Sequence, residues 1–273
     1  MNTFDHSVSL VVVCFLGLIV GSFLNVVIYR LPLFIEKKTD QSLIKFLSFP
    51  ASSCPHCKSP ISWFDNIPLL SWLHLKGRCR SCKKNISYQY PLVECMSGAI
   101  FLYAYLRFDL SLDFMVWALF FSMLLALFFI DLKTYYLPMQ LTISLIFLGI
   151  ISAYLGILKI NLIHSLIGLT IGYLILFIIN YLFKMARHKD GLGGGDFLLF
   201  GALGAWFGSM SLVPILLIAS LLGLIFALIT RLKGKDIALS DQIAFGPFLI
   251  ISSILIYIHQ YEYHLWVLKL YGL

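Results

Sequence analysis

Long apolar runs dominate the pattern of hydrophobic and polar positions along the chain. These runs lack the alternation of apolar and polar residues that marks a strand of a membrane barrel. Because every backbone amide in lipid needs an internal hydrogen-bond partner, the runs predict transmembrane helices. They cover about 8–29, 92–108, 112–130, 137–158, 161–183, 197–208, 211–230 and 244–267. The sixth run is short and adjoins the seventh, so the pattern predicts eight spans, with seven as the alternative.

The composition supports an all-α polytopic membrane protein and excludes a soluble domain with one anchor. Of the 273 residues, 60% are hydrophobic and 12% are charged, whereas soluble domains carry about 25% charged residues. Residues 2–6 contain no Lys or Arg, unlike the basic start of a cleavable secretory signal. We therefore expect the first helix to be retained.

The basic residues predict the orientation in the membrane. If the N-terminus is outside, 17 of the 20 Lys and Arg residues fall in cytoplasmic segments, as the positive-inside rule requires. The net charge of +7 is then explained by topological anchoring, helped by anionic lipid. No nucleic-acid partner is expected.

One long loop separates the first two runs and contains a metal-binding pattern. The pattern divides the chain into a first span at 1–30, a cytoplasmic loop domain at 31–91 and a multi-helix membrane domain at 92–273. Two Cys-x-x-Cys pairs stand twenty-one residues apart in the loop: Cys54, Cys57, Cys79 and Cys82. This spacing suits tetrahedral zinc, and disulfides are disfavoured in the reducing cytoplasm. The prediction is one structural zinc, because four thiolates leave no open position for a substrate; the alternative is four unrelated free thiols.

Two acidic residues lie at the edges of apolar runs. Asp131 closes the third predicted span, and Asp196 opens the sixth after Gly193, Gly194 and Gly195. In the predicted topology both reach the cytoplasmic face. Two carboxyl groups held close share a proton, so one can activate water while the other protonates a carbonyl. The glycines would let a substrate chain approach closely.

Three other interpretations account for part of this pattern. Each Asp could merely cap a helix end. An ion-coupled transporter also uses intramembrane carboxylates, although usually near the midplane. A non-catalytic scaffold that docks a secretion or pilus machine through its zinc loop would explain the cysteines, but it leaves the two carboxylates without a role.

Taken together, these motifs resemble those of bacterial prepilin peptidases, almost from end to end. The similar segments are residues 21–32, 54–57, 65–72, 77–82, 90–94, 130–138, 193–196 and 245–248. The chain departs from the family's usual pattern at Met139, where an Asp is common, and at Leu198, where a Lys is common.

The resemblance implies a bifunctional enzyme of the bacterial inner membrane. It would cut type IV prepilins or type II secretion pseudopilins after a Gly, between a basic leader and an apolar helix, with Asp131 and Asp196 as the catalytic pair. It would then methylate the new N-terminus with S-adenosylmethionine. The residues themselves show no dinucleotide-type Gly-rich fingerprint, so the methyl donor's ligands are not assigned.

Overall fold

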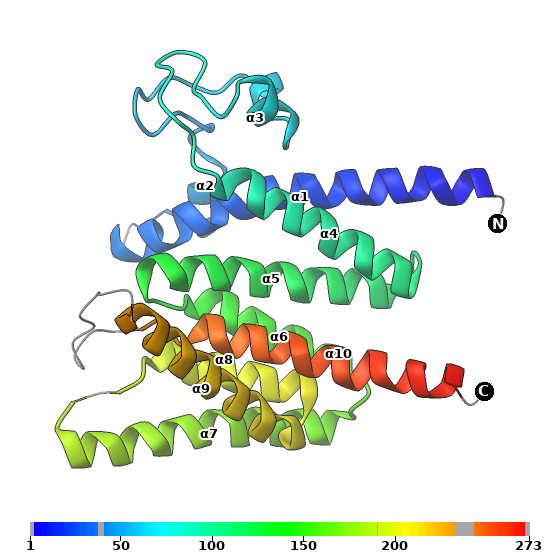
Figure 1. Cartoon of the computed structure of the whole chain (residues 1–273), viewed down its shortest axis with the longest axis vertical. Helices are drawn as coiled ribbons and strands as arrows, with labels where there is room; N and C mark the ends of the chain where they lie inside the picture. Colours follow the sequence, from blue (N-terminus) through cyan, green and yellow to red (C-terminus); the bar gives the residue numbers. More distant parts are fainter. Residues whose placement is uncertain (1–2, 38–40, 190, 233–242, 271–273) are drawn as a thin grey trace. The chain divides into compact units, whose positions relative to one another are not determined.

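The computed structural model describes residues 3–37, 41–189, 191–232 and 243–270, and these residues form helices and no β-strand. Lys233 and Lys235, which contribute to the count of basic residues, lie outside the described residues. The helices are α1 Thr3–Lys37, α2 Leu43–Ser48, the 3-10 helix η1 Trp63–Asn66, α3 Leu70–His74, α4 Gln89–Phe108, α5 Leu112–Thr134, α6 Met139–Tyr154, α7 Leu162–Arg187, α8 Gly194–Phe207, α9 Ser209–Leu232 and α10 Gly246–Leu270 (Figure 1).

Each of the eight apolar runs forms a helix, which confirms the all-α membrane class. Four helices are long and apolar enough to cross a membrane: α1 from Ser7, α5, α7 and α9. Apolar segments of α6, α8 and α10 are shorter. The chain is thus a multi-pass membrane protein, and its number of spans stays a prediction.

The chain divides into two compact units, and the boundary between them in the sequence falls within α5. The first runs from Met1 to Ala126 and the second from Leu127 to Leu273. This division reflects which residues pack together, whereas the boundaries predicted at 30/31 and 91/92 mark the ends of the loop. Those boundaries stay a prediction.

In the first unit, α1 packs along α4 (Figure 1). A buried apolar cluster joins them to the start of α5 through Val13, Phe101 and Phe114. The amide nitrogen of Asn25 donates a hydrogen bond of 3.1 Å to the Tyr90 carbonyl. This bond holds the two helices together where the long loop leaves and returns.

The loop itself contains two knuckles of the same backbone geometry. The Lys58 N–H donates to the Cys54 carbonyl at 2.9 Å, and the Lys83 N–H donates to the Cys79 carbonyl at 3.0 Å. Both lysines have positive φ, 59° and 58°. An isolated β-bridge closes each knuckle. The loop is therefore two similar turns joined by η1 and α3.

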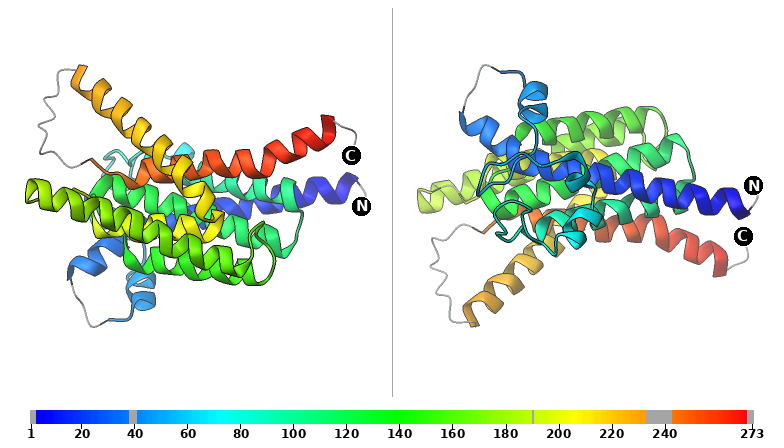
Figure 2. Two further views of the ribbon diagram at one scale, coloured as in Figure 1. Left: turned by 90° about the horizontal axis from the view of Figure 1, so that it is seen from below. Right: turned by 90° about the horizontal axis from the view of Figure 1, so that it is seen from above.

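In the second unit, α8 is the central helix. It contacts α6, α7, α9 and α10 (Figures 1 and 2). Every residue from Asp196 to Phe207 is buried except Leu198. The Trp206 indole N–H donates a hydrogen bond of 2.9 Å to the Leu145 carbonyl of α6. Asp196 is thus carried by the most enclosed helix of its unit.

Close packing of α7 on α8 depends on two facing glycines. A Cβ added to Gly168 would overlap the Gly204 carbonyl, including its carbon at 2.7 Å. A Cβ at Gly223 would meet Phe248 only at an ordinary 3.6 Å. We expect Gly168→Ala to force α7 and α8 apart at a cost of about 1–3 kcal/mol.

The measurement is thermal unfolding of the purified protein in detergent. Gly168→Ala should lower the Tm by about 5 °C, and the control Gly223→Ala should change it little. An unchanged Tm in Gly168→Ala would mean that this helix contact is looser than the structure shows.

Candidate active site and metal centre

Asp131 lies near the C-terminal end of α5, in the part that belongs to the second unit. Its side chain is 4% exposed. One carboxylate oxygen, Oδ2, accepts a hydrogen bond of 3.0 Å from the N–H of Gly246, the first residue of α10. The start of a helix presents unpaired N–H groups and a partial positive charge, so this position favours a carboxylate.

Asp196 occupies the first turn of α8 and is also buried. Its Oδ2 accepts a hydrogen bond of 3.1 Å from the N–H of Gly193, the N-cap residue. Asp196 therefore caps its own helix. The interpretation of Asp196 as a helix cap therefore has a structural basis. A substitution that keeps this hydrogen bond but removes the acid is needed to separate capping from catalysis.

The two carboxyl groups lie near enough to interact electrostatically. Leu137 links their surroundings, because it packs against the starts of both α8 and α10. A Cβ added at Gly195 would lie 2.7 Å from the Leu137 Cβ. A Cβ added at Gly246 would lie 3.2 Å from the Leu137 Cδ1 and 2.5 Å from the Asp131 Oδ2. Side chains at these two glycines would displace the helix starts to which the carboxyl groups are hydrogen-bonded.

The other glycines of the stretch have different surroundings. A Cβ at Gly194 would meet nothing within 4 Å, and one at Gly193 would meet only the Asp196 Oδ2 at 3.4 Å. All three glycines have φ outside the left-handed region. Gly195 therefore serves close packing, and Gly194 leaves open space beside Asp196.

Each carboxyl group keeps one oxygen available. Among the described residues, Oδ1 of Asp131 and Oδ1 of Asp196 have no protein hydrogen-bond partner, whereas each Oδ2 is held by one backbone N–H. A carboxyl group anchored through one oxygen has a fixed orientation. Its second oxygen can then accept a hydrogen bond from water when the group is ionised, or donate one to a peptide carbonyl when it is protonated.

Sequence reasoning did not assign a role to Gly246, the partner of Asp131. A signal was present, since residues 245–248 were part of the motif set and a Pro directly after Gly246 is typical of a helix start. Asn180 was also missed. Its Oδ1 accepts hydrogen bonds from the N–H groups of Gly191 and Leu192 at 2.8 and 3.0 Å, which fixes the chain just before the glycine stretch.

The loop of the first unit brings the four cysteines together. The sulfurs of Cys54, Cys57, Cys79 and Cys82 all lie within 4.8 Å of one another. The Cys54–Cys82 and Cys57–Cys79 sulfur pairs are each 3.9 Å apart. A tetrahedral zinc with bonds of about 2.3 Å places its sulfurs about 3.8 Å apart. The cluster therefore fits one zinc ion, held by all four thiolates.

The surroundings of Cys57 favour the thiolate that a metal requires. The Ser59 hydroxyl lies 2.9 Å from the Cys57 sulfur. Hydrogen bonds from this hydroxyl and from the Ser59 backbone lower the pKa of the Cys57 thiol to about 6. At neutral pH this thiol is therefore largely ionised, which is the form in which a cysteine binds a metal.

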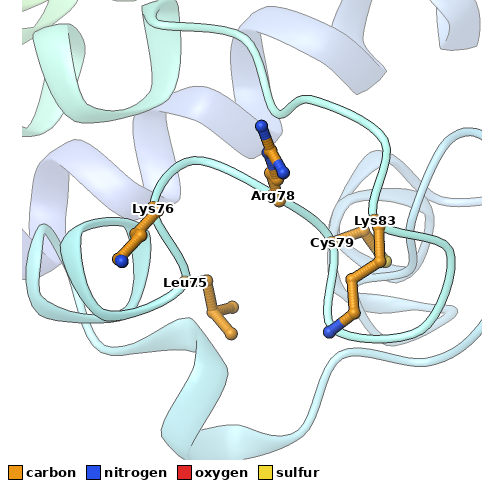
Figure 3. Close-up of a pocket in the computed structure, with 5 residues that line it drawn as sticks. All are labelled: Leu75, Lys76, Arg78, Cys79 and Lys83. Carbon is orange, nitrogen blue, oxygen red and sulfur yellow. The ribbon is translucent and has the colours of Figure 1, made fainter.

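The main hollow described in the loop does not suit S-adenosylmethionine. It is lined by Leu75, Lys76, Arg78, Cys79 and Lys83 (Figure 3). The methyl donor carries a sulfonium and an ammonium group against one carboxylate, so its net charge is positive and three cationic side chains repel it.

Comparison with known proteins shows the family of this chain. Residues 15–108 match the bacterial peptidase A24 N-terminal domain, and residues 118–228 match the type IV leader peptidase family. The chain belongs to the type IV leader peptidase family. The resemblance found in the motifs is thereby confirmed, as is the prediction of a membrane peptidase.

Relatives of this leader peptidase match it over most of their length. A Pectobacterium carotovorum subsp. carotovorum protein is 43% identical over 251 residues, which cover 88% of this chain and 89% of the relative. A Dickeya chrysanthemi protein is 40% identical over 92% and 93% of the two chains, and a Neisseria gonorrhoeae protein is 37% identical over 89% and 87%. All three are named prepilin leader peptidase/N-methyltransferase. No solved structure matches the chain.

Proposed function

We propose that this chain removes the leader from type IV prepilins or type II secretion pseudopilins, with Asp131 and Asp196 as the catalytic pair. The main observation in support is the pair of buried carboxyl groups. Each accepts a hydrogen bond through Oδ2 from an N–H at the start of a helix, and the two groups lie near enough to interact with each other. The names of the relatives support the substrate class.

The proposed reaction uses one ionised and one protonated carboxyl group. The ionised group takes a proton from water as the water oxygen attacks the carbonyl carbon of the scissile bond. The protonated group donates its proton to the carbonyl oxygen. The tetrahedral intermediate then collapses, the C–N bond breaks, and a proton passes to the leaving amine. The products are a leader ending in a carboxylate, after a Gly by the family resemblance, and a mature chain with a free amine.

An apolar hollow beside the site suits the substrate's hydrophobic helix. It has a volume of about 340 Å³ and lies in the second unit. Its lining residues are Leu176, Ile179, Asn180, Phe183, Gly191, Leu192, Leu216, Ser220 and Phe245. Leu192 directly precedes the glycine stretch, and Phe245 precedes Gly246. We propose that the start of the mature chain binds here while its basic leader stays in the cytoplasm.

Filling this hollow should weaken substrate binding more than it slows chemistry. Ser220→Trp places a large ring in the hollow, whereas Leu221 is 59% exposed on the same helix and provides the matched control Leu221→Trp. We expect Ser220→Trp to raise KM about tenfold or more, with kcat much less affected, because uniform binding is lost. Equal KM values for both variants and wild type would place the substrate elsewhere.

We further propose that the chain methylates the new N-terminus with S-adenosylmethionine. The names of the relatives and the resemblance of the loop motifs support this activity. The test is a mass-spectrometric assay of the purified protein in detergent with a synthetic prepilin N-terminal segment. Cleavage after the Gly supports the peptidase, and a further gain of one methyl mass with the donor present supports the methyltransferase.

The same assay separates the alternatives. Cleavage in detergent, where no ion gradient exists, would show that the activity does not need ion coupling, which an ion-coupled transporter requires. A folded protein that cuts no such segment would favour the zinc-loop scaffold.

A further inference from the structure

The second knuckle of the zinc loop borders a strongly basic hollow. Its volume is about 400 Å³, within the range of roughly 300–1,000 Å³ that small-ligand sites occupy. Figure 3 shows Lys76, Arg78 and Lys83 on different sides of it, with the Leu75 side chain between them. No acidic side chain is among the residues that line it.

The backbone that carries these cations is held in place by hydrogen bonds. The Gly77 N–H donates to the Trp72 carbonyl at 2.8 Å, and the Ile86 N–H donates to the Gly77 carbonyl at 2.7 Å. The Lys83 N–H donates to the Cys79 carbonyl at 3.0 Å, beside the metal ligands. The basic groups therefore project from fixed positions, although their side chains reach solvent.

The first knuckle supplies two of the four clustered cysteines without this charge. Lys58 and Lys83 occupy equivalent positions after their knuckles, with nearly the same φ and the same carbonyl contact. The bridge residue at Arg78 corresponds to the uncharged Ser53 in the first knuckle, and Lys76 corresponds to Ala51. The second knuckle thus carries four cations that the first lacks, at Lys76, Arg78, Arg80 and Lys84. Two of them, Lys76 and Arg78, line the hollow.

The positive charge of the hollow favours an anionic ligand. Cationic groups such as a basic leader are repelled, whereas a phosphate group is attracted and can accept hydrogen bonds from a guanidinium or an ammonium group. The loop directly follows α1, which is long and apolar enough to span a membrane, so the loop is tethered to the membrane. We propose that this hollow binds a phosphate group, carried by an anionic phospholipid headgroup or by a soluble phosphate.

The experiment uses the full chain in an uncharged detergent, with two arms. In one arm, binding of phosphatidylglycerol is measured by native mass spectrometry. In the other, inorganic phosphate is titrated and its Kd measured by calorimetry. The test variant is Arg78→Gln with Lys83→Gln. The control is Lys45→Gln with Lys58→Gln, which removes the same charge from the same loop away from the hollow.

We expect the test variant to bind about 25-fold more weakly, or about fivefold for each cation lost, and the control to bind as wild type does. Binding in the lipid arm alone assigns the headgroup, and binding in the phosphate arm alone assigns a soluble phosphate. Zinc content at the wild-type level shows that the loop is intact, and Lys76→Gln, farther from the metal ligands, provides a second variant. The proposal is overturned if wild type binds neither probe, or if the test and control variants bind equally.

Discussion

Asp196→Asn is expected to retain its helix cap and lose leader cleavage. The Asn side-chain oxygen can still accept the hydrogen bond from the Gly193 N–H, so α8 should begin as in wild type. The amide cannot transfer the proton that a carboxyl group transfers. General acid–base groups contribute about 10²–10⁴-fold, so the cleavage rate should fall by at least that factor.

Asp196→Ala supplies the comparison that separates the two roles. Ala removes both the cap and the acid, and the lost hydrogen bond should cost about 1 kcal/mol of stability. If Asp196 only caps α8, Asn should cleave nearly as wild type and Ala should be impaired in stability alone. If it is catalytic, both variants should be inactive, while only Ala unfolds at a lower temperature in detergent.

Replacing Cys57 or Cys82 with Ser is expected to empty the metal site. The four sulfurs lie within 4.8 Å of one another, and losing one thiolate spoils a closed tetrahedral shell. Zinc should fall from about one per chain to near zero. The loop should also become sensitive to protease between the two knuckles, because a domain of this size has little other core.

Cys95→Ser is the matched control, since Cys95 is an exposed thiol on α4 outside the cluster. It should retain zinc and the protease resistance of the loop. Metal analysis of the purified proteins reads the outcome. A folded and active wild-type enzyme without zinc would refute a structural metal here.

Local patterns predicted the elements and the metal ligands. Apolar runs located eight of the helices because lipid leaves the backbone no alternative to helix formation. Boundaries were less predictable. The sixth run was expected to begin at 197, but α8 begins at Gly194, because Asp196 caps the turn that precedes the apolar residues. Likewise α1 continues past 29 to Lys37, through Pro32, where hydropathy no longer marks the helix.

Contacts between distant residues could not be derived from these patterns. The sequence separates Asp131 from Gly246 by more than a hundred residues, and nothing local to either indicates that one accepts from the other. The packing of Leu137 against Gly195 and Gly246 depends in the same way on how three helices meet. The cysteine cluster could be predicted, because the Cys-x-x-Cys spacing within a short turn already places two metal ligands side by side.

The most direct test of the central claim is the rate at which purified Asp131→Asn cleaves a synthetic prepilin segment in detergent, measured beside wild type. Asp131 caps α10 rather than its own helix, and Asn can still accept from the Gly246 N–H, so the fold should be preserved. The proposed mechanism predicts no product above background, with an unchanged Tm. A rate near that of wild type would contradict the carboxyl pair as the source of catalysis.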